Sequence, residues 1–172
     1  MYELIAQSLG VVGMIVGLLA YQCKSSKGIL MTKFAANILW TIHYLMIGAI
    51  TAFATAIVCD IREFVYANEK NDKKRLVWLG IFMVLCVVSM VITWQGAVSL
   101  LPGIATMLST YGFYQKEAKN IRYVSIVFVV MMLVYDVIVM SYAGIVNQII
   151  TLFSIFIAIY RYRNVGEEAC EK

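Results

Sequence analysis

A stripe of polar and aromatic side chains follows one face of an expected helix between residues 30 and 47. Its members repeat at the spacing i, i+4, i+7 and i+11, as Lys33, Asn37, Trp40 and Tyr44. This spacing places them on one side of an α-helix. Rings that stack and an amide that hydrogen-bonds are typical of a site for a polar organic solute. The alternative, that the rings anchor the chain at a membrane interface, suits Tyr44 better than the deeper Trp40.

Two ionisable residues, His43 and Asp136, lie inside long apolar stretches and away from their charged ends. Ionisable groups are costly in apolar surroundings and are often functional there. A structural role, with the ring satisfied by water or by Tyr44, is as reasonable for His43 as a binding role. No basic residue is expected at the depth of Asp136. We therefore expect Asp136 to be protonated, to pair with a hydroxyl or amide, or to face a wet cavity.

Two adjacent amides, Asn147 and Gln148, stand in the last apolar stretch, where helix packing alone would need neither. Tyr135 precedes Asp136 in the stretch before it. The predicted solute-binding residues are therefore Asn37, Trp40, His43, Tyr44, Tyr135, Asp136, Asn147 and Gln148.

Other polar or small residues favour structural interpretations. Gly13 and Gly17 have the G-x-x-x-G spacing of closely packed helices, and Thr51, Thr55, Cys59 and Arg62 share a helix face that we also assign to packing. A charged group near the end of the third apolar stretch is expected to be solvated at the interface. It consists of Asp60, Arg62, Glu63, Glu69 and Lys70.

Nothing in the sequence indicates a catalytic centre. The chain has one histidine, no H-E-x-x-H motif and no nucleotide-binding motif. Its four cysteines, at positions 23, 59, 86 and 170, form no C-x-x-C pair. We expect no enzyme activity, no catalytic residue, no metal and no cofactor.

The composition shows what kind of elements must position these residues. With 62% hydrophobic and 14% charged residues and a mean hydropathy of +0.84, the chain is too apolar for a water-facing surface, and the lipid bilayer is its expected surroundings. A spanning helix needs about 20 mostly apolar residues. Seven such stretches are present: Glu3–Gln22, Leu30–Ile47, Thr51–Ala67, Leu76–Thr93, Val98–Gln115, Tyr123–Met140 and Ile145–Tyr160. The sequence predicts an all-α protein with seven transmembrane helices.

The basic residues fall at alternate linkers. They gather at the first, third and fifth linkers and in the tail: Lys24, Lys27, Lys33; Arg62, Lys70, Lys73, Lys74, Arg75; Lys116, Lys119, Arg122; and Arg161, Arg163, Lys172. The linkers between them carry no charge. Because Lys and Arg stay on the cytoplasmic side during insertion, the N-terminus is predicted outside and the C-terminus in the cytoplasm. Topology and anionic lipid headgroups explain the net charge of +4, and nucleic acid is not an expected partner.

An internal repeat relates the two halves. Tyr21-Gln22 recurs as Tyr114-Gln115, at an offset of 93 residues. The first three helices therefore correspond to the last three in the same order, and the fourth joins two parallel triple-helix units. The predicted parts are 1–68, the first unit; 69–97, a cytoplasmic loop and connector helix; 98–163, the second unit; and 164–172, a cytoplasmic tail.

Several short motifs support a family resemblance. Trp40-Thr41-Ile42-His43-Tyr44, Gly48-Ala49, Ser141-Tyr142-Ala143-Gly144 and Tyr160-Arg161-Tyr162 resemble the YgjV family of bacterial inner-membrane proteins. That family is distantly similar to the SWEET, PQ-loop and PnuC transporters, whose Pro-Gln pairs correspond to Tyr-Gln at Gln22 and Gln115. The resemblance implies the bacterial inner membrane and the three-plus-one-plus-three plan.

Together these features favour a transporter or facilitator for a sugar, a nucleoside or a vitamin-like solute, bound between the two units. The alternatives are a membrane scaffold or regulatory partner without transport and, with less support, a membrane-embedded enzyme. The expected partners are a small-molecule solute and the lipid bilayer, with a homo-oligomer left open.

Overall fold

A computed structural model describes residues 2–46, 50–92, 94, 96–138 and 140–162. It contains seven α-helices: α1 (Tyr2–Ala20), α2 (Ser26–Met46), α3 (Ile50–Asn68), α4 (Asp72–Ile92), α5 (Leu100–Tyr114), α6 (Ala118–Ile138) and α7 (Tyr142–Arg161). A short 3-10 helix, η1 (Ala97–Ser99), precedes α5. These bounds confirm a helix at each of the seven apolar stretches. Gly48, Cys170, Arg163, Lys172 and the predicted tail 164–172 lie outside the described residues.

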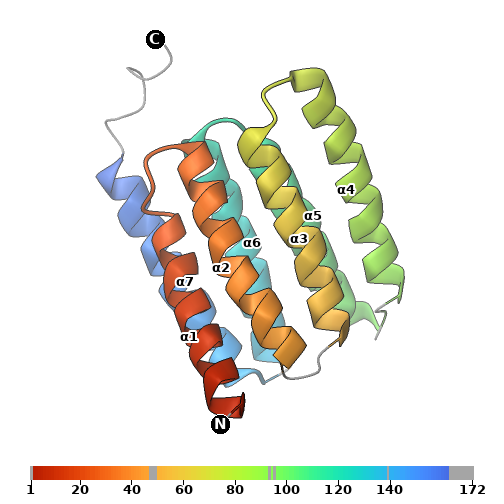
Figure 1. The fold of residues 1–172 in the computed structure, drawn as a ribbon, viewed down its shortest axis with the longest axis vertical. Helices are drawn as coiled ribbons and strands as arrows, with labels where there is room; N and C mark the ends of the chain where they lie inside the picture. Colours follow the sequence, from red (N-terminus) through yellow and green to blue (C-terminus); the bar gives the residue numbers. More distant parts are fainter. Residues whose placement is uncertain (1, 47–49, 93, 95, 139, 163–172) are drawn as a thin grey trace.

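The helices form two layers, with α4 at one edge (Figure 1). Helices α1, α2 and α3 pack in chain order in one layer, and α5, α6 and α7 do so in the other. Across the layers, α1 contacts α7, α2 contacts α6, and α3 contacts α5. Helix α4 packs mainly on α5, outside both groups of three.

The two ends of the bundle differ in charge. The linkers 21–25, 69–71 and 115–117 lie at the same end as the last turn of α7, whereas the N-terminus lies at the other (Figure 1). This end, called the basic end below, carries the lysines and arginines of those linkers and of the adjoining helix turns. The linkers that the sequence shows to be basic therefore all lie at one end of the bundle.

Local hydrogen bonds fix where several helices begin. The hydroxyl of Ser25 accepts the backbone N–H of Gly28 at 3.0 Å before the second turn of α2. The side-chain oxygen of Asn71 accepts the N–H groups of Lys73 and Lys74 at the start of α4. Such caps satisfy N–H groups that have no partner within the helix.

Close packing of α1 on α2 depends on the glycines of the G-x-x-x-G motif. A Cβ placed on Gly13 would lie 3.2 Å from the carbonyl oxygen of Ala36 and equally close to the Trp40 indole, and one on Gly17 would lie 3.7 Å from the Cβ of Ala36. The packing interpretation of this motif is confirmed. The contact also fixes the Trp40 ring against α1.

The outward faces of the helices are apolar. On α4 alone, Leu76, Val77, Val84, Val91 and Ile92 are exposed. Helices α4 and α6 and residues Gly144–Arg161 of α7 are long and apolar enough to cross a membrane. Helix α3 carries Asp60, Arg62 and Glu63, which lower its mean hydropathy although Arg62 and Glu63 face the protein interior. Seven spans in a three-plus-one-plus-three arrangement remain a prediction.

Candidate functional site

A cavity of about 930 Å³ lies between the two layers. Six helices contribute to its lining, whereas none of the described residues of α4 does. Gly13 and Gly17 of α1 line it beside the larger Met14 and Leu18, and Ala56 of α3 and Pro102 of α5 lie on the lining as well. The cavity is therefore lined by the same two groups of three helices that the sequence separates.

Six of the eight predicted site residues line this cavity: Asn37, Trp40, Tyr44, Tyr135, Asn147 and Gln148. They come from α2, α6 and α7, so the structure brings both halves of the chain to one site. The Trp40 and Tyr44 rings stack with centroids 5.7 Å apart and present an aromatic surface. Lys33, the first member of the α2 stripe, lines the cavity too.

His43 does not belong to the lining. Its side chain is 7% exposed and packs edge-on against the rings of Trp40 and Tyr44. A Cβ on Gly10 of α1 would lie 3.4 Å from its Nδ1 atom. The position of His43 fits the structural alternative better than a binding role.

Asp136 is also outside the cavity lining, but it is hydrogen-bonded to Gln148, which is part of that lining. The carboxylate accepts a hydrogen bond of 3.3 Å from the Gln148 side-chain amide. It lies against Gly144 in the first turn of α7, where a Cβ would come within 2.5 Å of it. A helix N-terminus stabilises negative charge. Among the alternatives stated for Asp136, pairing with an amide is the one that the structure contains.

The sequence interpretation of a solvated charge cluster is wrong for two of its members. Arg62 is 6% exposed and Glu63 is 2% exposed, because both lie in the bundle interior. Glu63 accepts a hydrogen bond of 2.8 Å from the Asn37 amide, which lines the cavity. The available signal is that Arg62 shares a helix face with Cys59, which lines the cavity and which the sequence assigns to packing.

The interior arginine joins α3 to α5. Arg62 donates from Nη1 to the hydroxyls of Thr110 at 2.8 Å and Ser109 at 3.4 Å. Its Nη2 lies 3.7 Å from Glu63 Oε1, and its guanidinium carbon lies 5.0 Å from the centre of the Phe113 ring. The hydroxyls and the carboxylate offset the cost of burying the charge.

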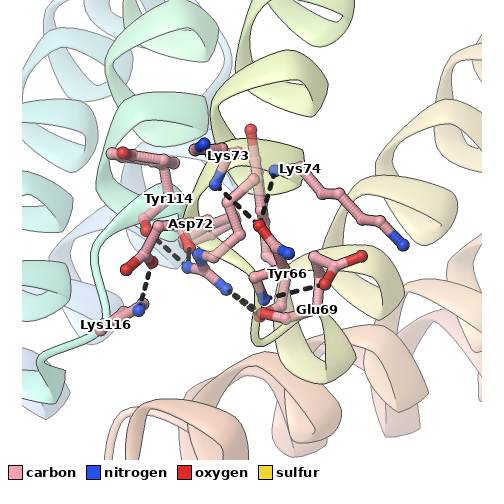
Figure 2. A network of polar contacts seen from close by, with 10 residues as sticks. Tyr66, Glu69, Asp72, Lys73, Lys74, Tyr114 and Lys116 are labelled. Atoms are coloured by element: carbon pink, nitrogen blue, oxygen red, sulfur yellow. Dashed lines mark hydrogen bonds and ion pairs between the residues drawn. The ribbon is translucent and has the colours of Figure 1, made fainter.

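At the basic end a second arginine, Arg75, holds α3 and α5 together. Its guanidinium donates to the backbone oxygens of Tyr66 at 2.6 Å and Glu69 at 3.1 Å, at the end of α3. It also donates to those of Phe113 and Tyr114, at the end of α5. Figure 2 shows Tyr66 and Tyr114, whose rings both lie against this guanidinium, and the ion pair of Asp72 with Lys116. Because helix ends leave carbonyl groups without partners, one cation satisfies both helices.

A corresponding contact joins α1 to α7. Arg122 donates to the backbone oxygens of Cys23 at 2.6 Å and Tyr21 at 3.2 Å, and its guanidinium carbon lies 4.7 Å from the centre of the Tyr162 ring. The Tyr162 hydroxyl donates to the Gln22 backbone oxygen at 2.7 Å.

Deeper in the same contact, the Gln22 side chain donates to the backbone oxygen of Ser154 at 2.7 Å and to its hydroxyl at 3.1 Å. Ser154 returns a hydrogen bond of 2.7 Å to the Leu18 backbone oxygen.

The chain belongs to the Imp-YgjV family, described as a bacterial inner membrane protein, whose model matches residues 4–165. The predicted family resemblance is confirmed, and the protein is one of a bacterial inner membrane family. No curated protein and no solved structure matches the chain. The more distant resemblance to the sugar-transporter group remains a prediction.

Proposed function

We propose that the protein is a transporter or facilitator that moves a small polar organic solute through the cavity between the two layers of helices. The observation that carries this proposal is the cavity lining. It combines stacked aromatic rings on α2 with the phenol of Tyr135 on α6 and the amides of Asn147 and Gln148 on α7. Concave sites with apolar walls and a few polar groups are the usual form of small-molecule sites.

The pairing of helices supports two parallel units around a central site. If α1, α2 and α3 correspond to α5, α6 and α7, a twofold axis along the membrane normal exchanges the α1–α7 contact with the α5–α3 contact. The same axis maps the α2–α6 contact onto itself. The contacts across the layers follow this pattern, and α4 lies outside it as a connector would.

The charge difference between the two ends supports an orientation with the basic end in the cytoplasm. The C-terminal end of α7 then lies inside and the N-terminus outside. In this orientation the contacts of Arg75 and Arg122 lie at the cytoplasmic end of the bundle.

Uptake by purified protein in liposomes tests the proposal. A panel of radiolabelled sugars, nucleosides and vitamin-like compounds is offered to wild-type protein and to the Trp40→Ala and Asn147→Ala variants. Loss of a stacking or hydrogen-bonding group costs about 1 to 3 kcal/mol, or roughly tenfold to a hundredfold in affinity. Trp94→Ala is the matched control, since Trp94 is exposed and is not part of the lining.

We expect saturable uptake of at least one solute, weakened by both cavity variants and unchanged in the control. Absence of flux for every solute, together with a stoichiometric membrane partner in a pull-down, would favour the scaffold alternative. Equal uptake by the cavity variants and the wild type would separate transport from this cavity.

A further inference from the structure

Lys33 is the only charged residue among the described residues that line the cavity. Its ammonium group does not extend to the water beyond the basic end. The Nζ atom lies 4.6 Å from the centre of the Tyr21 ring and 5.5 Å from that of Phe113, and both rings are buried. The common structural role of such a lysine, in which the charged head reaches the membrane surface, does not describe this position.

The carboxylate nearest in the fold already has other partners. Glu63 directs Oε2 to the Asn37 amide and Oε1 toward Arg62. Among the described residues, none provides a carboxylate oxygen within 4.0 Å of Lys33 Nζ. The aromatic rings stabilise a cation less than a desolvated ionic partner would. The two neighbouring cations Lys33 and Arg62 therefore share one carboxylate, that of Glu63.

We propose that the solute bound in the cavity carries one anionic group, a carboxylate or a phosphate, which pairs with Lys33. This inference rests on the proposed function and names the class of its substrate. Lys33 interacts with the Tyr21 side chain and, beyond 4.0 Å, with the charge of Glu63, and the solute supplies the close ionic partner.

The stripe on α2 also sets how such a solute lies. Seven residues separate Lys33 from Trp40, so their backbones are about 10 Å apart along the helix. The anionic group then points to the basic end, and the body of the solute extends toward the stacked Trp40 and Tyr44 rings. The Asn37 amide nitrogen is engaged by Glu63, which leaves the Asn37 carbonyl as an acceptor for the solute between these two ends.

Matched pairs of compounds test the inference without knowledge of the natural solute. The probes are benzoate with benzamide, indole-3-acetate with indole-3-acetamide, and glucuronate with glucuronamide. Each pair keeps its shape and differs by one negative charge. Binding is measured by calorimetry and by thermal stabilisation of the full chain in phosphatidylcholine nanodiscs.

We expect at least one carboxylate to bind tenfold or more tightly than its amide. Lys33→Gln should abolish that difference, while Lys33→Arg retains most of it. Lys27→Gln is the control, because it removes the same charge from an exposed position on the same helix. The comparison within each pair uses the wild-type protein, so it remains decisive if Lys33→Gln fails to fold.

Amides that bind as tightly as their carboxylates would overturn the anionic class while leaving transport of a neutral solute in place. So would an undiminished preference for carboxylates in Lys33→Gln. Stabilisation by phosphatidylglycerol and by no free carboxylate would assign Lys33 to lipid and overturn it as well. If no compound binds and the liposome panel also shows no uptake, the proposed function fails together with it.

Discussion

The contact of α1 with α7 and that of α3 with α5 join the same two layers, yet they do so with different groups. The α1–α7 contact depends on neutral groups below the basic end, where Gln22 and Ser154 exchange hydrogen bonds with α7 and α1. The α3–α5 contact depends on the buried charge of Arg62 at the equivalent side of the bundle. Neutral hydrogen bonds therefore join α1 to α7 at the position where a buried arginine joins α3 to α5.

Both contacts end in an arginine that binds helix carbonyl groups. Arg122, in the first turns of α6, reaches two carbonyl groups just after α1, and Arg75, at the start of α4, reaches four at the ends of α3 and α5. Each guanidinium also lies over a tyrosine ring of the helices it joins. Cations stabilise the negative end of a helix dipole, so the same physical solution arises twice from different helices.

The comparison shows that equivalent helix pairs in the two layers need not be joined by equivalent side-chain contacts. Tyr21-Gln22 and Tyr114-Gln115 match in sequence, but the Gln22 side chain binds α7 whereas, in the described part of the chain, no hydrogen bond is formed by the Gln115 side chain. We expect the α3–α5 contact, with its charged donors, to contribute more to stability than the α1–α7 contact.

The largest effect is expected for Arg75→Gln. It removes a charged donor from four carbonyl groups, and hydrogen bonds to charged groups contribute about 1.5 to 3 kcal/mol each. Since some carbonyls regain water at the helix ends, we expect the free energy of unfolding to fall by about 3 kcal/mol. Titration with SDS of purified protein in mixed micelles measures it.

Lys74→Gln is the control for Arg75→Gln, because Lys74 is an exposed neighbour with the same charge. Its effect should stay within about 0.5 kcal/mol. A similar loss in both variants would show that net charge at the basic end, rather than the carbonyl contacts, stabilises the fold.

A smaller effect should distinguish the two repeated glutamines. Gln22→Ala removes two neutral hydrogen bonds to Ser154 and should lower the free energy of unfolding by about 1 to 2 kcal/mol. Gln115→Ala should change it by less than about 0.5 kcal/mol. The same SDS titration compares them, and equal losses would mean that the contacts are alike where the sequences are alike.

The sequence predicted the helices and much of the candidate site for a physical reason. Apolar stretches of about 20 residues have few alternatives to a helix, and a single face of α2 carried Asn37, Trp40 and Tyr44 toward the cavity. Whether these residues bind a solute remains a prediction.

The depth of the interior charges could not be predicted, because neither a shared helix face nor a position along a helix gives depth in the bundle. Arg62 and Glu63 stand next to charges at the basic end, and only the packing of α3 on α2 and α5 reveals that they are buried. The roles of Arg75 and Arg122 depend on which helix ends lie side by side, which local spacing does not contain. Asp136 stands out in the sequence as an ionisable residue in an apolar stretch, but its partner Gln148 comes from the next helix.

The smallest predicted effect isolates one bond of the α1–α7 contact. Tyr162→Phe removes the 2.7 Å hydrogen bond to the Gln22 backbone oxygen and keeps the ring beneath Arg122. A neutral hydrogen bond contributes about 0.5 to 1.5 kcal/mol, so a loss of this size is expected in the SDS titration. Tyr160→Phe is the control, because that side chain is 81% exposed. If Tyr162→Phe destabilises the protein as much as Arg75→Gln, the α1–α7 contact is not the weaker of the two, and the difference drawn between neutral and charged contacts does not hold. If it matches Tyr160→Phe, the ring and the arginine alone hold this end of α7.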